Sequence, residues 1–276
     1  MENLFDYTGR RCLFTGCASG MGEAGARIVS SLGGRVVAVD VKKPGGFDYE
    51  AFHEVDLRDP AAIDQMLAEV SADGPIDRLF YCAGLPGTAP ALDVMLVNFL
   101  GLRHCVEQAL THMPGDGAIV TISSAGGMGY VAMMDKIMPL LHEAGHAEGK
   151  RWIEAHQGED WFEPYSFSKA CTIAYTLWRG ANLTSETGIR LNAISPGPTD
   201  TPMMPSFIEH AGAKFMAAYP RSVGRNSTAE EQGWPLAFLN SNAASYISGE
   251  NLYTDAGTAG GLMTGAVTLD ASLMGK

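Results

Sequence analysis

Tyr165 and Lys169 lie four residues apart in the stretch YSFSK, and in a helix this spacing puts both side chains on one face. A free phenol has a pKa of about 10, which is too high for ready proton transfer at neutral pH. A neighbouring ammonium favours the phenolate, so we expect Lys169 to lower the pKa of Tyr165. The pair therefore predicts a group that gives and takes a proton, although a solvated Tyr–Lys pair has the same spacing.

Two further polar residues could complete a catalytic site with this pair. Ser124 ends the apolar run GAIVTISS (117–124), and its hydroxyl can bind a substrate oxygen as charge develops on that atom. Asn98 lies in MLVNFLG, inside a helical pattern where an amide is a poor helix former. We expect Asn98 to hold a water that relays protons to Lys169; a plain buried polar residue is the alternative.

A glycine-rich turn, TGCASGMG at 15–22, follows the first predicted strand. Its glycines allow the backbone to approach a diphosphate closely, and a helix starting near Gly20 would point free N–H groups at the phosphates. This strand–turn–helix context is the one that a dinucleotide-binding motif requires. The predicted binding residues of the turn are Gly16, Ser19, Gly20, Met21 and Gly22.

Carboxylates after the next two predicted strands could bind the adenosine half of a dinucleotide. Asp40 ends RVVAVD (35–40), where it can accept both ribose hydroxyls and would repel a 2′-phosphate, which favours NAD over NADP. Lys42 and Lys43 could soften that preference, and a solvated strand-end aspartate is the alternative. Further along the chain, the expected adenosine contacts are Asp56, Leu57 and the CAG stretch Cys82, Ala83 and Gly84.

Six short apolar runs alternate with amphipathic stretches along the chain and supply the elements that would position these residues. Such runs are typical of strands buried on both faces. Strand and helix in alternation predict right-handed βαβ units, and hence an α/β fold with one doubly wound parallel sheet covered by helices on both faces. Residues 1–276 are expected to form a single domain. Two stretches interrupt the pattern, a polar helical insert at about 125–164 and a Met-, Phe- and Pro-rich lid at about 200–227.

The composition narrows the class of protein. The net charge of −12 disfavours binding to phosphate backbones, so nucleic acid is not an expected partner. The first residues lack the basic segment followed by an apolar segment that is typical of a secretory signal. No apolar run approaches the roughly 18 residues of a membrane helix. Five cysteines without a C-x-x-C pair indicate reduced thiols. We therefore expect a cytoplasmic protein without a membrane partner.

Taken together and in this order, the motifs resemble those of the short-chain dehydrogenase/reductase family. The resemblance runs from T-G-x-x-x-G-x-G through CAG, ISS and Y-x-x-x-K to SPGPTDTP (195–202) and SYISGENLYTDAG (245–257). It implies a Rossmann-like fold, a nicotinamide cofactor and a catalytic tetrad made of Ser124, Tyr165, Lys169 and Asn98. It also implies that the cofactor is contacted by Tyr165 and Lys169 and, after the sixth strand, by Pro196, Gly197, Thr199 and Thr201.

Three features depart from the family pattern. Cys82 stands where the family usually has the asparagine of N-A-G, and DAG near the C-terminus replaces D-G-G. The third is the stretch of 40 residues (125–164) between Ser124 and Tyr165, where the family normally has a short segment. Such an insert, with C-A-G-L after the fourth strand, is similar to the 3α-hydroxysteroid dehydrogenase/carbonyl reductase branch. The family implies a homo-oligomer, a dimer or tetramer, and the insert could block or alter a contact between its subunits.

The insert contains HEAGH (142–146), which fits H-E-x-x-H, the helical pattern of two zinc-binding histidines. A catalytic zinc needs a third protein ligand, and Trp152 stands where one known pattern places a histidine. Gly145 also weakens the helix that would align the two histidines. We therefore expect no metal, with His142 and His146 as surface residues of the insert; a zinc hydrolase is the alternative.

The predicted function is hydride transfer between NAD and a secondary alcohol or ketone, with Tyr165 exchanging the hydroxyl proton. Apolar side chains of the lid favour a bulky hydrophobic substrate such as a steroid, terpenoid or aromatic ketone, unless they merely form the core side of a helix. A polyol, sugar or dihydrodiol is the alternative substrate. A nucleotide-sensing module would share the glycine turn but would not need Ser124, Tyr165 and Lys169. The apolar lid residues are Met203, Met204, Phe207, Ile208, Phe215 and Met216.

Overall fold

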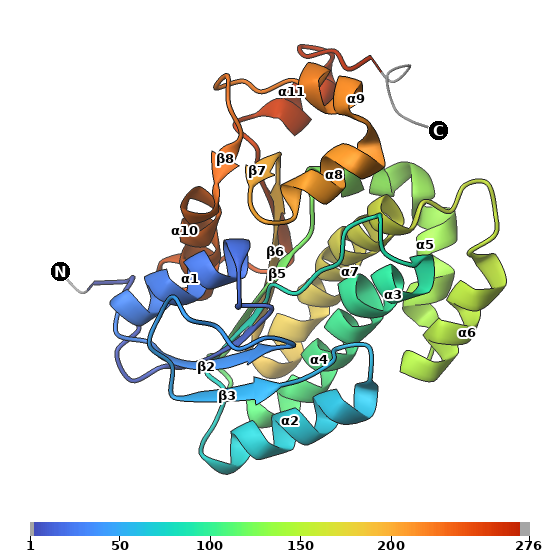
Figure 1. Ribbon diagram of the computed structural model, residues 1–276. Helices are drawn as coiled ribbons and strands as arrows, with labels where there is room; N and C mark the ends of the chain where they lie inside the picture. The colour runs from blue at the N-terminus through green and yellow to red at the C-terminus, as the bar shows by residue number, and fades with distance from the viewer. Residues whose placement is uncertain (1–2, 271–276) are drawn as a thin grey trace.

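Seven parallel strands form the central sheet of the computed structural model, which describes residues 3–270 (Figure 1). In spatial order the sheet reads β3-β2-β1-β4-β5-β6-β9, and every neighbouring pair is parallel. The chain winds outward from β1 in one direction and from β4 in the other, so a topological switch point lies between these two strands. The predicted doubly wound, Rossmann-like α/β fold is confirmed. The strands are β1 Arg11–Thr15, β2 Arg35–Asp40, β3 Ala51–Glu54, β4 Arg78–Tyr81, β5 Ala118–Ile122, β6 Arg190–Pro196 and β9 Glu250–Thr254.

Helices cover both faces of the sheet, and neighbouring residues of one strand point into different cores. Phe14 of β1 and Phe80 of β4 stack with 3.9 Å between their ring centroids in one core. Leu13 and Leu79, one residue earlier in each strand, belong to the other core. Because both faces are buried, the strands read as continuous apolar runs. The first core is covered by α1 Gly20–Ser31 and α10 Ala229–Asn240, and the second by α2 Pro60–Ala72, α3 Ala91–Met95, the π-helix η1 Leu96–Gly101, α4 Leu102–Ala109 and α7 Pro164–Thr187.

The polar stretch before α7 is helical. It packs against α7 and η1, and aromatic rings fill the junction; Trp161, for example, lies 5.2 Å from Phe167 and 6.3 Å from Trp152 between ring centroids. This packing fixes the stretch against the helix that carries Tyr165 and Lys169. Its elements are the 3-10 helix η3 Ala125–Met133, α5 Met134–His142 and α6 His146–His156.

A second excursion, at residues 199–228, rises above the carboxyl-terminal edge of the sheet (Figure 1). Two short strands, β7 and β8, pair in parallel and form its base, while two helices form its upper part. None of the helices in residues 3–270 is both long and apolar enough to cross a membrane. The remaining elements are β7 Thr199–Asp200, α8 Met204–Ala211, α9 Ala213–Ala218, β8 Ser227–Thr228, α11 Thr258–Thr264 and the 3-10 helices η2 Leu110–His112 and η4 Asn242–Ala244.

Candidate active site

The glycine turn after β1 leaves no room for side chains. Gly16 adopts a φ of 71°, and its N–H donates to the carbonyl of Val39 at 2.8 Å. A Cβ on Gly16 would overlap the backbone of Ala83, and a Cβ on Gly22 would overlap the Gly16 carbonyl and lie 2.9 Å from the Cβ of Cys82. The turn therefore requires glycine at both positions, and it forms a cradle of bare backbone at the switch point.

The N-terminus of α1 opens onto this cradle. Ser19 is the N-cap in an extended conformation, and within residues 3–270 its side chain makes no capping hydrogen bond. The first-turn amides of α1 therefore keep the exposed partial positive charge that attracts anions. Gly20, with a φ of 60°, faces Thr201, since a Cβ on this glycine would lie 3.5 Å from the Cβ of Thr201. Met21 follows inside the same turn.

Asp40, at the end of β2, braces the glycine turn. Its Oδ2 accepts from the amide of Ala18 at 2.8 Å, and its Oδ1 accepts from the amide of Lys42 at 3.1 Å. The side chain is only partly buried, and each carboxylate oxygen has a second lone pair for an external donor. The geometry thus matches the position predicted for a ribose-binding carboxylate.

Two other predicted contacts are engaged elsewhere. Asp56 lies past the end of β3 and pairs with Arg58 at 2.6 Å, and hydrogen bonds from Arg58 lower the pKa of the Asp56 carboxyl. Arg58 in turn reaches Asp93 at 3.0 Å. Leu57 is buried in the core of the second face. Because Asp56 already has a cationic partner, a contact with adenine would have to compete with Arg58.

The stretch after β4 links the cradle to the catalytic side. The Cys82 amide donates to the carbonyl of Thr15 at 2.9 Å, and burial raises the pKa of the Cys82 thiol. A Cβ on Gly84 would lie 3.4 Å from Oδ1 of Asn98 and 3.7 Å from Nζ of Lys169. Cys82, Ala83 and Gly84 therefore lie between the glycine turn and the predicted tetrad.

The loop after β6 supplies one accessible group and one that is already engaged. Pro196 ends β6, and the amide of Gly197 donates to Thr254 at 3.5 Å. Thr199 is buried, and its hydroxyl lies 2.9 Å from the Gly197 carbonyl and 2.8 Å from Oγ of Ser227. Thr201 instead faces the cradle at Gly20. Of the two threonines, only Thr201 thus presents its side chain toward the predicted phosphate site.

The start of α7 positions Tyr165. Glu163 is the N-cap: its Oε1 accepts from the Tyr165 amide at 3.0 Å and its Oε2 from the Ser166 amide at 2.6 Å, while Pro164 occupies the first turn. Ser124 follows β5, and its Oγ accepts from the Gly126 amide at 3.0 Å. A Cβ on Gly126 would lie 3.4 Å from that Oγ and 3.6 Å from the Tyr165 ring. Ser124 and Tyr165 are therefore brought together across Gly126.

Lys169 and Asn98 lie deeper. Lys169 is 4% exposed, and its Nζ donates to the carbonyl of Ile122 at 2.9 Å. The Asn98 side chain accepts from the Leu85 amide at 2.7 Å and donates to the Leu85 carbonyl at 3.0 Å and to Oγ of Ser168 at 3.2 Å. These bonds tie the loop after β4 to α7, and Asn98 does so from the π-helix η1, a local distortion that often marks functional positions.

The electrostatics of the tyrosine differ from the prediction. Burial raises the pKa of Tyr165 to about 12; a hydrogen bond with Ser124 opposes this shift, and the charge of Glu163 adds to it. Burial also lowers the pKa of Lys169 to about 8. The expected net lowering of the Tyr165 pKa is wrong for this structure, because the effect of burial is the larger one. Nζ of Lys169 donates to the Ile122 carbonyl and lies 5.8 Å from the centre of the tyrosine ring.

The lid touches the site at two points, and one of them is Phe207, a residue of the predicted lid. Phe207 of α8 packs edge-to-face on Tyr165, with 5.0 Å between ring centroids. His210, one turn further, places its Nε2 3.2 Å from Oε1 of Glu163. Glu163 carried a local signal, since an acidic residue before a proline is a helix-start pattern. His210 carried none, because its partner is far away in the chain.

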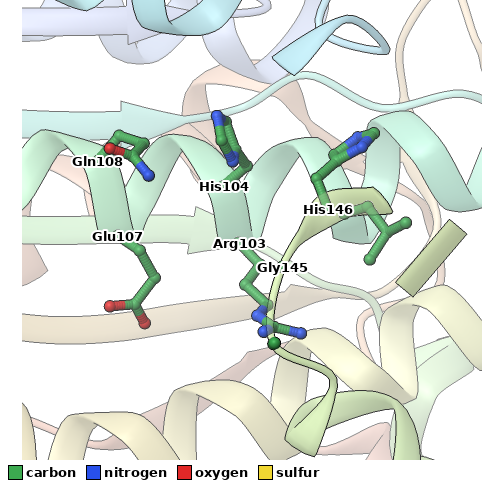
Figure 2. A pocket seen from close by; sticks show the side chains of 8 residues that line it. Arg103, His104, Glu107, Gln108, Gly145 and His146 are labelled. Carbon is green, nitrogen blue, oxygen red and sulfur yellow. The ribbon is translucent and has the colours of Figure 1, made fainter. Parts of the chain in front are cut away.

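HEAGH does not form one helix. His142 ends α5, and His146 begins α6, so the two side chains lack the one-turn spacing of the zinc pattern. A cavity of about 80 Å³ separates this junction from α4 (Figure 2). His146 is not a surface residue as expected: it is half-buried beside His104, with 5.8 Å between ring centroids, and its Nε2 has no hydrogen-bond partner within residues 3–270. The described residues contain no group of three or more His, Cys, Asp or Glu side chains suited to a metal ion.

Known proteins resemble the chain over almost its whole length. Residues 10–135 match the family described as short chain dehydrogenase, and residues 127–259 match the one described as enoyl-(acyl carrier protein) reductase. Coniferyl-alcohol dehydrogenase of Pseudomonas sp. strain HR199 is 31% identical over 252 residues, which cover 91% of this chain and 97% of that protein. The 3-alpha-hydroxysteroid dehydrogenase/carbonyl reductase of Comamonas testosteroni is 30% identical over 256 residues, with 89% and 95% covered.

A solved structure shares the fold. The crystal structure of the 3-alpha-hydroxysteroid dehydrogenase from Pseudomonas sp. B-0831, complexed with NADH, gives a TM-score of 0.75 at 26% identity and covers 94% of this chain and 100% of that one. The resemblance to the hydroxysteroid dehydrogenase/carbonyl reductase branch is therefore confirmed in sequence and in fold. The chain is an oxidoreductase that belongs to the short-chain dehydrogenase/reductase family.

Proposed function

We propose that this protein is an NAD-dependent oxidoreductase that interconverts a secondary alcohol and the corresponding ketone. The observation that carries the proposal is the meeting of Ser124, Tyr165 and Lys169 beside the glycine cradle, at the carboxyl-terminal edge of one parallel sheet. In doubly wound sheets this edge, at the switch point, is where ligands bind. A binding module would need the cradle alone, without a buried lysine next to a tyrosine and a serine.

The cradle fits a dinucleotide. Gly16 and Gly22 leave backbone where side chains would block a diphosphate, and the first turn of α1 and Thr201 face the same space. Asp40 would bind the adenosine ribose, and its charge favours NAD over NADP. The further residues that we assign to the cofactor are Ser19, Gly20, Met21, Cys82, Ala83, Gly84, Pro196, Gly197, Tyr165 and Lys169. Asp56, Leu57 and Thr199 would contact it through their backbone, because their side chains are engaged elsewhere. When bound, the nicotinamide supplies an acceptor or donor for the hydride of the carbinol carbon.

In the proposed oxidation, the substrate oxygen lies between Ser124 and Tyr165. Ser124 donates a hydrogen bond to that oxygen, and Tyr165 as phenolate takes the hydroxyl proton, so the alcohol loses one hydride and one proton to become a ketone. Reduction is the reverse, with Tyr165 as the proton donor. Lys169, held by Ile122, keeps a positive charge near the phenol. Asn98 fixes the loop after β4 against α7 and so maintains the geometry of all three groups.

The lid favours a substrate with a large apolar part. No residue of α8, which the structure describes in full, is buried, so its apolar side chains do not belong to the core. Met204, Ile208 and Met216 line a cavity of about 260 Å³, and Arg221 and Asn226 are its polar lining residues. Phe215 differs, because it is buried and packs near Tyr219. We therefore propose residues 200–227 as a lid over a ring-bearing substrate.

The names of the relatives support this substrate class. One relative is a coniferyl-alcohol dehydrogenase and another a 3-alpha-hydroxysteroid dehydrogenase/carbonyl reductase. A dihydrodiol is the second candidate, because Arg221 and Asn226 add polar side chains to the lining of the lid cavity and a 2,3-dihydro-2,3-dihydroxybenzoate dehydrogenase of Bacillus subtilis is 29% identical. We further propose that the protein is a homo-oligomer, which light scattering would test, and that it lies in the cytoplasm, which cell fractionation would test.

The test is a panel of secondary alcohols and their ketones, supplied with NAD or NADP and followed by the absorbance of reduced nicotinamide. The panel should contain hydroxysteroids, aromatic and terpenoid alcohols, a dihydrodiol and a sugar alcohol. We expect turnover with NAD and the highest kcat/KM for a ring-bearing alcohol. Absence of turnover with every alcohol and ketone would overturn the proposed function.

A further inference from the structure

We infer that His210 is a positioning residue that holds the lid helix α8 over Tyr165. Its ring contacts the carboxylate of Glu163 and packs on the backbone of Gly87. The inference rests on the proposed function, since it concerns the substrate side of the same site.

The partner of His210 is the cap of the catalytic helix. Oε1 of Glu163 lies 3.2 Å from Nε2 of His210, and the same oxygen accepts from the Tyr165 amide at 3.0 Å. A single carboxylate therefore joins the lid to the turn of α7 that carries the tyrosine. The histidine and glutamate side chains are 29% and 43% exposed. A contact that is this open to water is weak enough to break and form again as substrates enter and leave.

The His210 ring packs on glycine backbone in the loop after β4. A Cβ on Gly87 would lie 2.5 Å from both Cε1 and Nε2 of the His210 ring, so the ring rests on the glycine itself. This loop is anchored two residues earlier, where Leu85 makes two hydrogen bonds with Asn98. The ring thus lies between the loop after β4 and the cap of α7, and that cap binds the amide of Tyr165.

The lid helix has little else to hold it on this side. No residue of α8 is buried, and a further contact with the catalytic helix is that of Phe207 with the ring of Tyr165. A helix without buried side chains gains little stability from packing, so its position depends on tethers such as this one. Loss of the His210 contact should therefore loosen α8 over the substrate while Ser124, Tyr165 and Lys169 stay in place.

The experiment is a double-mutant cycle between Gly87 and His210. His210→Ala should raise KM about tenfold for the best ring-bearing substrate and change kcat less than about threefold, because substrate binding is lost but the chemical groups are not. Gly87→Ala should raise KM similarly in the wild-type background, since the new methyl group displaces the ring. In the His210→Ala background, where that space is empty, Gly87→Ala should have no further effect.

Two further variants separate positioning from general stability. His210→Gln places an amide N–H within reach of Glu163 and should restore most of the wild-type KM. Glu209→Ala changes the exposed neighbour of His210 on the same helix and should leave KM unchanged. Additive effects of Gly87→Ala and His210→Ala, or equal losses in His210→Gln and His210→Ala, would overturn the assignment. So would a fall in thermal stability that parallels the change in KM.

A measurement without substrate keeps this inference independent of the proposed activity. Amide hydrogen exchange of residues 204–211 should be faster in His210→Ala and Gly87→Ala than in the wild type and in Glu209→Ala. Equal exchange in all four proteins would overturn the role assigned to His210. If the wild type turned over no alcohol or ketone but the exchange rates differed as expected, the proposed function would fail and the role of His210 would stand.

Discussion

The cofactor cradle and the lid are held by different kinds of contact. At the cradle, Gly16 and Gly22 lie against backbone and Cys82, and any added carbon would overlap atoms that cannot move aside. At the lid, α8 meets the rest of the site through Phe207 and His210, side chains that can turn away. The cradle is thus rigid, because its close-packed backbone leaves no space for movement, whereas the lid can adjust its position. This difference suits a site in which one ligand is constant and the other must enter and leave beneath a cover.

The largest effect should come from the chemical group that lies between the two regions. Tyr165→Phe removes the hydroxyl that exchanges the substrate proton, and we expect kcat to fall about a thousandfold. NADH affinity, measured by fluorescence titration, should change little. Tyr246→Phe, at a fully exposed tyrosine, is the matched control. A Tyr165→Phe variant that retains most of its activity would remove the tyrosine from the mechanism.

The cradle can be broken with a single carbon. In Gly22→Ala the new Cβ would overlap the Gly16 carbonyl, so the turn must shift away from the diphosphate position. We expect cofactor affinity to fall about 100-fold, because forcing an added carbon into a close-packed site typically costs about 1–3 kcal/mol. NADH fluorescence measures it, with Gly158→Ala as the control, because a Cβ there meets no atom within 4 Å. Equal affinities in the two variants would contradict a close-packed cradle.

The sequence predicts the cradle better than it predicts the contacts of the lid. The glycine turn and Asp40 could be placed because backbone geometry and strand order follow from local patterns. The Glu163–His210 contact could not, because it joins residues far apart in the chain through side chains of unremarkable type. The direction of the Tyr165 pKa shift was also missed. A pattern of residues shows which groups are neighbours, but the burial that dominates this pKa depends on the assembled fold.

The pH dependence of kcat/KM for oxidation tests the effect of burial on the pKa of Tyr165. Oxidation needs the phenolate of Tyr165, whose pKa is raised to about 12 in this structure, and the bound oxidised nicotinamide should lower it. Below the pKa of Tyr165 in the complex, kcat/KM for oxidation should rise about tenfold per pH unit, and the reduction rate should not rise. Near pH 8 the increase should flatten, because the Lys169 ammonium, with a pKa of about 8, begins to lose its charge. Oxidation that is independent of pH between 6 and 8 would argue against Tyr165 as the base.

The smallest effect concerns selectivity at the rim of the cradle. Asp40→Asn keeps an oxygen to accept from Ala18 but removes the charge that would repel a 2′-phosphate. We expect the ratio of kcat/KM with NAD to that with NADP to fall about tenfold, the value of one hydrogen bond to a charged group. Asp48→Asn, an exposed carboxylate a few residues further on, should leave the ratio unchanged.

The two possible failures of this last prediction have different meanings. If Asp40→Asn lowers activity equally with both cofactors, Asp40 acts mainly through the Ala18 amide, as a brace of the turn. If the wild type already uses NADP as well as NAD, Lys42 and Lys43 must offset the carboxylate. In both cases the rigid cradle would select for a dinucleotide, while the choice between the two dinucleotides would depend on side chains at its exposed rim. The choice of cofactor would then depend on movable side chains, as contact with the lid does, and not on the rigid backbone of the glycine turn.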